Sequence, residues 1–330
     1  PALACIARIP VRQRAAQTLA IAVDGGALGT EASRIADLGV GAVILQRPNP
    51  GGLTGGITQL KAASAIAPLV MVDEEGGESQ VLRDVVGSLP SEPSIASGGD
   101  PAAAQAEVLA HAQSVAALGV DVVLGPVVDV TTPGGGGPLA ERSFSDDPAQ
   151  VAAFGAAYRD AYLEAGLIPV FKHFPGHGAA SGDSHDGPVS VPGIETLRGR
   201  DLLPYEQLLS EQGVGVMVAH VVVPDVTGLT AASQSPELVQ GVLREEMGFD
   251  GLVMTDSLSM GAIAFRTPPE VSFPTAVAAG ADLALFVTIA DPAAAITAME
   301  AAVASGQVRE ARLNEAVNRV LQAKAIDPCA

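Results

Sequence analysis

The stretch Gly166–Gly178 reads Gly-Leu-Ile-Pro-Val-Phe-Lys-His-Phe-Pro-Gly-His-Gly, and the fold prediction starts from it. Its first part, Gly166–Phe171, is apolar and strand-like, which predicts a strand buried on both faces. Its second part, Lys172–Gly178, is rich in glycine and carries one lysine and two of the five histidines. Asp183-Ser184-His185 follows after four residues and adds a third histidine beside an aspartate. A buried strand that ends in such residues predicts a parallel sheet with its chemistry at the carboxyl ends of the strands.

Short apolar runs alternate with longer amphipathic stretches on both sides of this segment. The runs predict eight strands: Leu19–Val23, Ala42–Leu45, Leu69–Val72, Val122–Leu124, Ile168–Lys172, Val216–Ala219, Leu252–Thr255 and Leu283–Val287. The amphipathic stretches predict eight helices, several with proline in the first turn: Thr30–Leu38, Ile57–Ala65, Pro101–Leu118, Pro148–Glu164, Ile194–Ser210, Pro236–Glu246, Pro269–Ala279 and Pro292–Ser305. Two further helices are predicted at Val11–Thr18 and Val308–Ala325.

Eight strand–helix units predict an α/β fold, a closed (β/α)8 barrel of the TIM type, as a single domain over residues 1–330. In this interpretation residues 1–18 are a helical lead-in, and residues 308–330 are a C-terminal helix and tail. The alternative is a Rossmann-like pair of domains, but no Gly-x-Gly-x-x-Gly motif follows the first strand. Gly25-Gly26 and Gly39-x-Gly41 are interpreted as turn glycines.

Composition excludes several classes of partner. The 18 basic and 37 acidic residues give a net charge of −19, which argues against nucleic acid and anionic membranes. The longest apolar runs, such as residues 214–223, are interrupted and fall short of the roughly 20 residues that a membrane helix needs. Aromatic residues make up only 3% of the chain and tryptophan is absent. We therefore expect a small pocket rather than a long polysaccharide groove.

Polar side chains follow five of the predicted strands where those strands end. They are Asp73-Glu74-Glu75-Gly76-Gly77 after strand three, Asp129 shortly after strand four, Lys172-His173 at strand five, His220 after strand six and Asp256 after strand seven. The carboxyl ends of barrel strands meet on one face, so these side chains are expected to converge there on an active site.

Several motifs at these positions are recognisable: Val72–Gly77, Glu141–Phe144 (Glu-Arg-Ser-Phe), Lys172–Gly178 and Asp183–His185, with Leu243–Gly251 and Thr255–Met260 in the C-terminal half. Together they resemble the family 3 glycoside hydrolases, specifically the single-domain β-N-acetylglucosaminidases. The resemblance spans nearly the whole chain. It implies a barrel enzyme that needs no cofactor and no metal.

The resemblance implies a retaining mechanism in which Asp256 is the nucleophile. A carboxylate at the end of a buried strand stabilises an oxocarbenium-like transition state and then forms a covalent glycosyl-enzyme. The alternative role for Asp256 is a helix N-cap. The resemblance further implies that His185 is the acid/base and that Asp183 orients it; imidazole suits proton transfer near neutral pH. A histidine near a solvated aspartate on a surface loop is the alternative.

By the same matching, Lys172, His173, Arg142 and Asp73 bind hydroxyls of the terminal sugar. An ion pair at the barrel mouth, which needs no ligand, is the alternative role for Arg142 and Asp73. Three further candidates for the site are Arg83, His177 and His220. The family loop after Asp73 continues Glu-Gly-Gly-Arg-Val-Gln-Arg, whereas here Glu78 and Val81 replace the two arginines, and the nearest arginine is Arg83. This departure leaves open how the outer hydroxyls and the leaving group are held.

The predicted activity is removal of non-reducing terminal β-linked N-acetylglucosamine, from peptidoglycan-derived muropeptides if the cell-wall role of relatives applies, by a bacterial protein that acts as a monomer. Phosphorolysis and β-glucosidase activity are alternatives within the family. Phosphorolysis is physically possible because a histidine acid/base does not repel phosphate as a carboxylate would. A zinc hydrolase built on His173, His177, His185 and Asp183 is a third reading. A catalytically silent sugar-binding barrel is the alternative from another class.

The two cysteines lie at opposite ends of the sequence, Cys5 and Cys329. A closed barrel brings its ends together, so a disulfide between them is expected, and disulfides persist in oxidising compartments. Two free thiols, or a lipid on Cys5, are the alternatives. The chain opens at Pro1, which suggests a processed start. We therefore expect an exported protein, extracellular or in the cell envelope, with a cytoplasmic location as the alternative.

Overall fold

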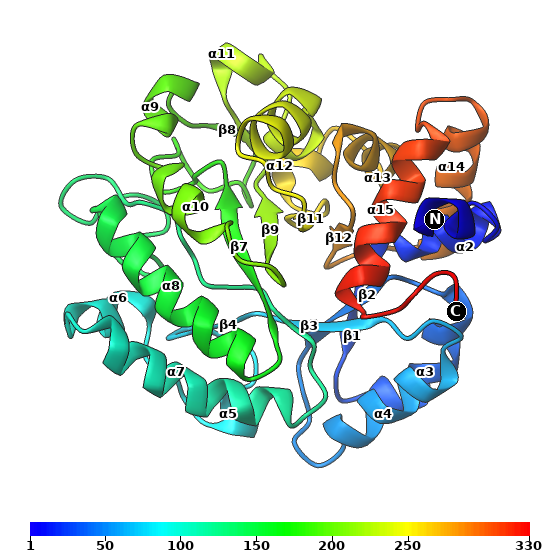
Figure 1. Ribbon diagram of the computed structural model, residues 1–330, viewed down its shortest axis with the longest axis horizontal. Coiled ribbons are helices and arrows are strands. Elements are labelled where there is room, and N and C mark those ends of the chain that lie inside the picture. Colours follow the sequence, from blue (N-terminus) through cyan, green and yellow to red (C-terminus); the bar gives the residue numbers. More distant parts are fainter.

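The computed structural model describes residues 1–330 and contains one parallel sheet of eight strands (Figure 1). In chain order the strands are β1 (Leu19–Asp24), β2 (Ala42–Gln46), β3 (Leu69–Val72), β6 (Val122–Val123), β7 (Ile168–Phe174), β9 (Gly215–Val218), β11 (Leu252–Thr255) and β12 (Ala284–Phe286). Their spatial order is β11-β9-β7-β6-β3-β2-β1-β12, and a bridge between Met254 and Leu283 brings the two edges together. The predicted barrel is confirmed.

The strands are apolar throughout because they are buried on both faces. Successive residues alternate between two cores: Ala20 and Ile44 belong to a smaller cluster inside the barrel, whereas Ile21 and Val43 belong to the larger cluster between the barrel and its helices. A sheet covered on both faces leaves no polar side to the strands. This is why the chain reads as runs of apolar residues rather than as alternating ones.

Helices surround the sheet (Figure 1). The longer ones are α2 (Val11–Gln17), α3 (Leu28–Leu38), α4 (Leu53–Ala63), α7 (Pro101–Ala116), α8 (Pro148–Glu164), the π-helix η2 (Glu237–Glu246), α13 (Pro269–Ala279), α14 (Pro292–Ala304) and α15 (Glu310–Ala323). Shorter ones are α1 (Ala2–Ile6), α5 (Arg83–Val86), α6 (Glu92–Ser97), α9 (Ile194–Arg198), α10 (Leu203–Leu208), α11 (Pro224–Thr227), η1 (Ala232–Gln234) and α12 (Gly261–Ala264). None of the helices is long and apolar enough to cross a membrane.

Two predicted elements differ from the structure. The single helix expected at Ile194–Ser210 is broken into α9 and α10, because Pro204 in the first turn of α10 has no N–H with which to continue a preceding helix. The lead-in of residues 1–18 holds two helices, α1 and α2, rather than one. A short antiparallel hairpin, β4 (Glu74–Gly76) with β5 (Ser79–Gln80), and a small parallel pair, β8 (Val189–Ser190) with β10 (Val221–Val222), were not predicted.

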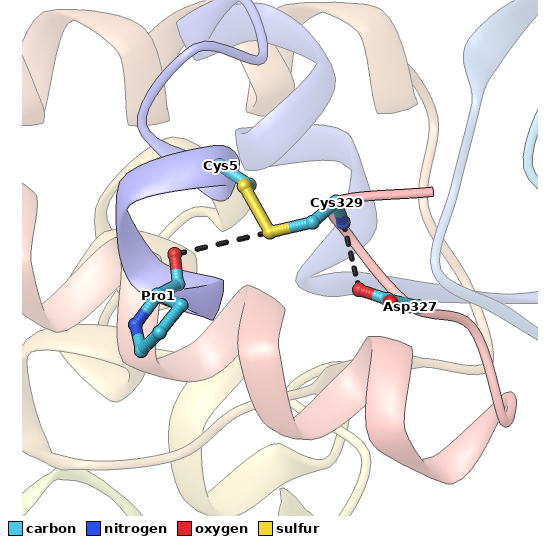
Figure 2. The surroundings of a disulfide bond; sticks show 4 residues. All are labelled: Pro1, Cys5, Asp327 and Cys329. Atoms are coloured by element: carbon cyan, nitrogen blue, oxygen red, sulfur yellow. Dashed lines mark hydrogen bonds between the residues drawn. A yellow bond between two sulfur atoms is a disulfide. The ribbon is translucent and has the colours of Figure 1, made fainter.

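A disulfide joins the two ends of the chain (Figure 2). Cys5 in α1 pairs with Cys329, their Cα atoms lie 5.4 Å apart, and no free cysteine remains. The sulfur of Cys329 also lies 3.9 Å from the carbonyl oxygen of Pro1. The expected disulfide is confirmed. Because Cys5 is paired, the structure does not contain the alternatives, two free thiols or a lipid on Cys5.

Replacing both Cys5 and Cys329 by serine is expected to lower thermal stability. The bond spans a sequence separation of 324 residues. In the chain-entropy model a loop of this size is worth on the order of 5 kcal/mol, which corresponds to a loss in Tm of about 5–10 °C for a chain of this length. Calorimetry of the oxidised protein beside the double variant measures this loss. An unchanged Tm would mean that the ends contribute nothing to the unfolding equilibrium.

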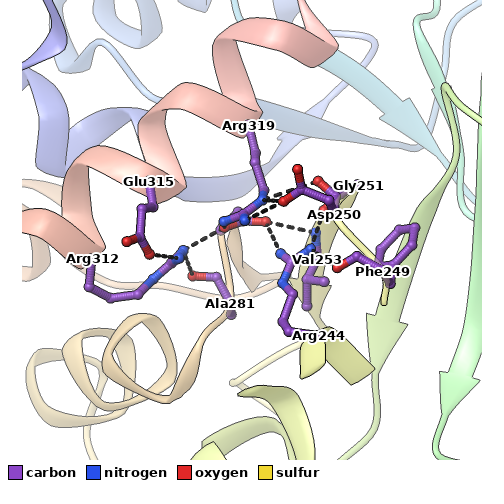
Figure 3. A network of polar contacts seen from close by, with 10 residues as sticks. Arg244, Phe249, Asp250, Gly251, Val253, Ala281, Arg312, Glu315 and Arg319 are labelled. Atoms are coloured by element: carbon purple, nitrogen blue, oxygen red, sulfur yellow. Dashed lines mark hydrogen bonds and ion pairs between the residues drawn. The ribbon is translucent and has the colours of Figure 1, made fainter. Parts of the chain in front are cut away.

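A charged cluster fixes α15 to the face of the barrel where the strands begin (Figure 3). The buried carboxylate of Asp282 accepts hydrogen bonds from Arg244 at 2.6 Å and from Arg312 at 2.5 Å, and Arg319 of α15 lies 3.6 Å away. Asp250, just before β11, pairs with Arg319 as well. These ion pairs hold the closing helix in place on the face away from the polar strand ends.

Candidate active site

A cavity of about 330 Å3 opens at the carboxyl ends of the strands. The residues that line it include six of the predicted site residues: Asp73, Arg142, Lys172, His173, His185 and Asp256. They come from the ends of β3, β7 and β11 and from the loops after β6 and β7. The barrel therefore brings together residues that are up to 183 positions apart in the sequence.

The floor of the cavity is a buried ion network centred on Glu75. Arg142 donates to both carboxylate oxygens of Glu75, from Nε and Nη2, at 2.8 Å each. Lys172 Nζ lies 2.5 Å from Glu75 and donates to Asp73 at 2.9 Å. Asp73 thus pairs with Lys172 and not with Arg142. The two acids differ in exposure: the side chain of Asp73 is 35% exposed, whereas that of Glu75 is 3% exposed.

Glu75 is ionised in this setting. Burial by itself raises the pKa of its carboxyl group, but Lys172 and Arg142 outweigh burial and lower the pKa to about 2. The hairpin β4–β5 places Glu75, and Gly76 turns it at a φ of +94°, where a side chain would collide with the carbonyl oxygen of Pro90. Glu75 was not among the predicted site residues. The acidic run Asp73-Glu74-Glu75 was its only signal in the sequence.

A second buried carboxylate, Asp129, orients the histidines of the Lys172–Gly178 segment. Its Oδ2 accepts from the backbone N–H of His173 at 3.0 Å and lies 2.7 Å from Nδ1 of the same residue. Its Oδ1 accepts from the backbone N–H of His177. Burial raises the pKa of Asp129, but His173 and His177 together outweigh burial, and the pKa falls below its usual value. An ionised Asp129 therefore fixes the ring of His173 toward the cavity.

Asp256 follows β11 at the cavity wall. The backbone N–H of Ser257 donates to its Oδ1 at 2.7 Å. Burial raises the pKa of Asp256, but His173, the backbone hydrogen bond from Ser257 and the charge of Lys172 lower it, and the pKa lies below the usual aspartate value. Asp256 is therefore a carboxylate near neutral pH, held in place by one backbone hydrogen bond, and it does not cap α12, which begins at Gly261.

His220 lies behind Asp256 and does not line the cavity. Its Nε2 is 2.8 Å from the carbonyl oxygen of Ser257 and its Nδ1 is 2.7 Å from the hydroxyl of Ser233. Burial lowers the pKa of His220, so the ring is neutral. A carbonyl oxygen only accepts, so Nε2–H donates to Ser257, and Nδ1 accepts from Ser233. His220 thus supports the backbone that positions Asp256.

Asp183 and His185 form the pair that the Asp-Ser-His motif predicts. Asp183 Oδ1 lies 2.7 Å from His185 Nδ1 and accepts from the backbone N–H of His185 at 2.9 Å. Burial raises the pKa of Asp183, but the hydrogen bonds from His185 outweigh it and lower the pKa. Both side chains are more than half exposed, at 55% and 64%. The imidazole thus stands at the solvent edge of the cavity with Nε2 unengaged by Asp183.

The loop that carries His185 is attached at two points. Gly261 and Ala262, at the start of α12, donate their N–H groups to the carbonyl oxygens of His185 and Ser184 at 3.1 Å each. The hydroxyl of Ser184 also lies 3.0 Å from Nε2 of the buried His177. His177 therefore packs within the loop, away from the cavity lining, and secures the residue that precedes His185.

Two other sequence interpretations can be placed. Arg83 opens α5, does not line the cavity, and lies 3.9 Å from Glu78. Glu78 and Val81, which replace arginines of the family pattern, do line it. The structure does not support the alternative of a zinc hydrolase. No three histidine, cysteine, aspartate or glutamate side chains lie close enough together to hold a metal ion.

Comparison with known proteins identifies the family. Residues 11–323 match the model of the Glycosyl hydrolase family 3 N terminal domain. The chain belongs to glycosyl hydrolase family 3. It is therefore a glycoside hydrolase, as the resemblance implied.

Relatives within family 3 cover most of the chain. Beta-hexosaminidase LpqI of Mycobacterium tuberculosis is 38% identical over 282 residues, which are 83% of this chain and 72% of LpqI. The crystal structure of a family 3 member from Mycobacterium smegmatis superimposes with a TM-score of 0.91 at 37% identity, covering 96% of this chain and 98% of that one. A family 3 β-N-acetylglucosaminidase from Paenibacillus sp. gives 0.90 at 30% identity, over 95% and 62% of the two chains.

Proposed function

We propose that this protein is a retaining exo-β-N-acetylglucosaminidase in which Asp256 is the nucleophile and His185, held by Asp183, is the acid/base. The observation that carries the proposal is that an ionised carboxylate and an imidazole line one small cavity whose floor is a set of buried ions. The names of the relatives, a β-hexosaminidase and a β-N-acetylglucosaminidase, support the choice of sugar.

In the first step a carboxylate oxygen of Asp256 attacks the anomeric carbon as the glycosidic bond breaks. The leaving oxygen takes a proton from Nε2 of His185, and a glycosyl ester of Asp256 forms. The lowered pKa of Asp256 keeps its electron pair available for attack. The hydrogen bond from Ser257 holds Oδ1, so Oδ2 has the free lone pairs.

In the second step water attacks the anomeric carbon of the ester. Neutral His185 now accepts the proton of that water through Nε2, and the bond to Asp256 breaks to restore the carboxylate. Asp183 accepts from Nδ1–H in both steps, which stabilises the imidazolium formed in the second. The exposure of His185 suits a group that must meet a leaving sugar and then a water molecule.

The buried ions select the terminal sugar. Lys172 donates to substrate hydroxyls while Asp73, half-buried beside it, accepts from them. His173 offers its Nε2 to a further hydroxyl, because Asp129 occupies Nδ1. A cavity of about 330 Å3 suits one sugar ring rather than an extended chain, which favours action at the non-reducing end.

The natural substrates in this proposal are glycans with terminal N-acetylglucosamine, and muropeptides are the form that the family resemblance implies. An exported location is part of the same proposal. The Cys5–Cys329 disulfide supports it, because such bonds persist outside reducing compartments. Phosphorolysis remains the second candidate reaction, since the acid/base is an imidazole and the cavity wall it forms carries no added negative charge.

Hydrolysis of an aryl β-N-acetylglucosaminide tests the proposal. The experiment compares it with the matching β-glucoside, with and without phosphate and a chelator. Release from the N-acetyl substrate alone, indifferent to chelator, is the expected result. Formation of a sugar 1-phosphate would replace hydrolysis by phosphorolysis. If neither glycoside is cleaved, the proposed activity is wrong.

The loss of activity on replacing His185 by alanine is expected to depend strongly on the leaving group. An activated aryl glycoside departs without protonation, so its kcat/KM, which reports the first step, should fall by about 10-fold or less, whereas the kcat/KM of a disaccharide should fall by about 10²–10⁴-fold. Steady-state kinetics on both substrates measures the difference. Equal losses would assign His185 to substrate positioning instead of proton transfer. Asp186→Ala, an exposed acid in the same loop, serves as the control and is expected to behave like the unaltered protein.

A further inference from the structure

One phenylalanine stands apart from the others. Of the eight in the chain, seven are at most 4% exposed, whereas Phe265 is 76% exposed. Leaving a large aromatic ring in water forgoes the gain from burying it. Single exposed apolar residues are common on protein surfaces, so the position of Phe265 decides whether it has a role.

Phe265 lies against the residue that carries the proposed acid/base. Gly261 donates its N–H to the carbonyl oxygen of His185. A Cβ atom added to Gly261 would lie 2.5 Å from that oxygen and 2.8 and 3.0 Å from two atoms of the Phe265 ring. The ring and the backbone of His185 therefore enclose the same point. Phe265 itself lies outside the cavity lining; Met260 and Val287 give that lining apolar surface, and Val287 is 41% exposed.

An exposed carboxylate, Glu78, lies on the other side of the mouth. In the closed order of eight strands, β3 and β11 are four positions apart, so the segments that follow them face each other across the barrel axis. Phe265 follows β11, and Glu78, in the turn of the β4–β5 hairpin, follows β3. The Glu78 side chain is fully exposed and lines the cavity; its nearest cation, Arg83, is 3.9 Å away and outside the lining.

We propose that Phe265 and Glu78 form the leaving-group subsite and select an uncharged sugar with an apolar face, such as a second N-acetylhexosamine. His185 gives its proton to the leaving oxygen, so the leaving sugar lies on the His185 side, over Phe265. The C–H face of a pyranose packs on an aromatic ring. A carboxylate on the leaving sugar, as in N-acetylmuramic acid, meets Glu78 as a like charge. This inference rests on the proposed removal of terminal N-acetylglucosamine, and it disfavours the N-acetylmuramic acid leaving group of the muropeptides that the resemblance implies.

The first test replaces Phe265 by alanine. Kinetics on diacetylchitobiose should show kcat/KM reduced by about 3- to 10-fold, the range of one aromatic contact. Inhibition by free N-acetylglucosamine, which fills only the terminal-sugar pocket, should be unchanged. Phe265→Tyr keeps the ring and should restore the rate. Leu3→Ala, at an exposed apolar position in α1, is the control and should have no effect.

The second test replaces Glu78 by glutamine. The ratio of kcat/KM for N-acetylglucosaminyl-N-acetylmuramic acid to that for diacetylchitobiose should rise about 3- to 10-fold, and added salt should shrink the difference between the two proteins. In the unaltered protein diacetylchitobiose should be the better substrate.

The outcomes separate this inference from the function on which it rests. If the unaltered protein cleaves no β-N-acetylglucosaminide, the proposed function fails. If it cleaves both disaccharides and prefers the muramic acid form, or if Phe265→Ala leaves diacetylchitobiose unaffected, the leaving-group assignment alone is overturned. A rise in the inhibition constant of N-acetylglucosamine in Phe265→Ala would place Phe265 at the terminal sugar, which also overturns it.

Discussion

Replacing Asp256 by alanine is expected to abolish turnover, with kcat lowered by about 10⁴-fold or more, as for loss of a covalent nucleophile. The side chain lies at the cavity wall, and its hydrogen bond is to the neighbouring backbone, so the fold should persist. Activity on an aryl β-N-acetylglucosaminide and circular dichroism measure the two effects. Normal activity in the folded variant would remove Asp256 from the mechanism.

Asp24→Ala is the matched control for this experiment. Asp24 also stands at the carboxyl end of a barrel strand, but it pairs with the exposed Arg47 and does not line the cavity. Its replacement should leave kcat within about twofold, in keeping with the small energies of exposed ion pairs.

A mechanism-based fluorinated glycoside should attach its sugar to Asp256 in the unaltered protein but not in Asp256→Ala. Mass spectrometry of the labelled peptides measures this attachment.

Replacing Glu75 by glutamine is expected to damage both activity and stability. Lys172 and Arg142 would keep their buried charges but lose the carboxylate between them, a change that costs about 3–5 kcal/mol. Displacement of these two side chains should lower kcat/KM by about 10²-fold. Thermal unfolding and steady-state kinetics measure the losses. A variant of Glu75 with unchanged kcat/KM would show that the network does not position the substrate.

Glu92→Gln provides the contrast. Glu92 is as buried as Glu75 and accepts from the backbone N–H of Val127 at 2.9 Å, but no cation pairs with it. Burial, and then the charge of Glu75, raise the pKa of Glu92 well above its usual value, so it is a neutral acid. Glutamine resembles a neutral glutamic acid in shape, and its carbonyl still accepts from Val127. The change should therefore cost about 1 kcal/mol or less.

The lowered pKa of Glu75 also predicts how the free energy of unfolding depends on pH. The pKa of Glu75 falls from 4.5 to about 2 on folding, so its stabilising contribution is complete above pH 4.5 and is lost as the pH falls toward 2. By linkage this contribution is about 3 kcal/mol. In Glu75→Gln the free energy of unfolding should therefore fall less steeply between pH 4.5 and 2. An identical slope in both proteins would mean that folding does not lower the pKa of Glu75.

The barrel could be predicted because each of its strands is buried on both faces, which leaves an uninterrupted apolar run in the sequence. Strands β3 and β11 have the predicted ends, since polar residues follow them at once. The β4–β5 hairpin escaped prediction because its strands have only three and two residues. The break between α9 and α10 depends on one proline in a stretch that otherwise has a helical pattern.

The parts of the candidate site that lie within one sequence motif could be predicted. The parts that depend on which side chains are buried could not. Asp183 and His185 are only two positions apart in the sequence, so their pairing could be anticipated. The pairing of Glu75 with Lys172 and Arg142 joins strand β4, strand β7 and the loop after β6, and the sequence does not say which acid of Asp73-Glu74-Glu75 points inward. Glu74 in fact contacts His111, behind the cavity. The exposure of Phe265 could not be anticipated either, because nothing in the sequence distinguishes it from the seven phenylalanines that are buried.

The disulfide at the two ends of the chain has a consequence for engineering. With Cys5 and Cys329 bonded and Pro1 beside them, the backbone is close to a ring. A short peptide could replace the bond, and new termini could be opened in the exposed glycine turn at Gly134-Gly135. Such a circular permutant would keep every barrel strand intact. It would also move the ends to the catalytic face, where a second module could be fused beside the cavity.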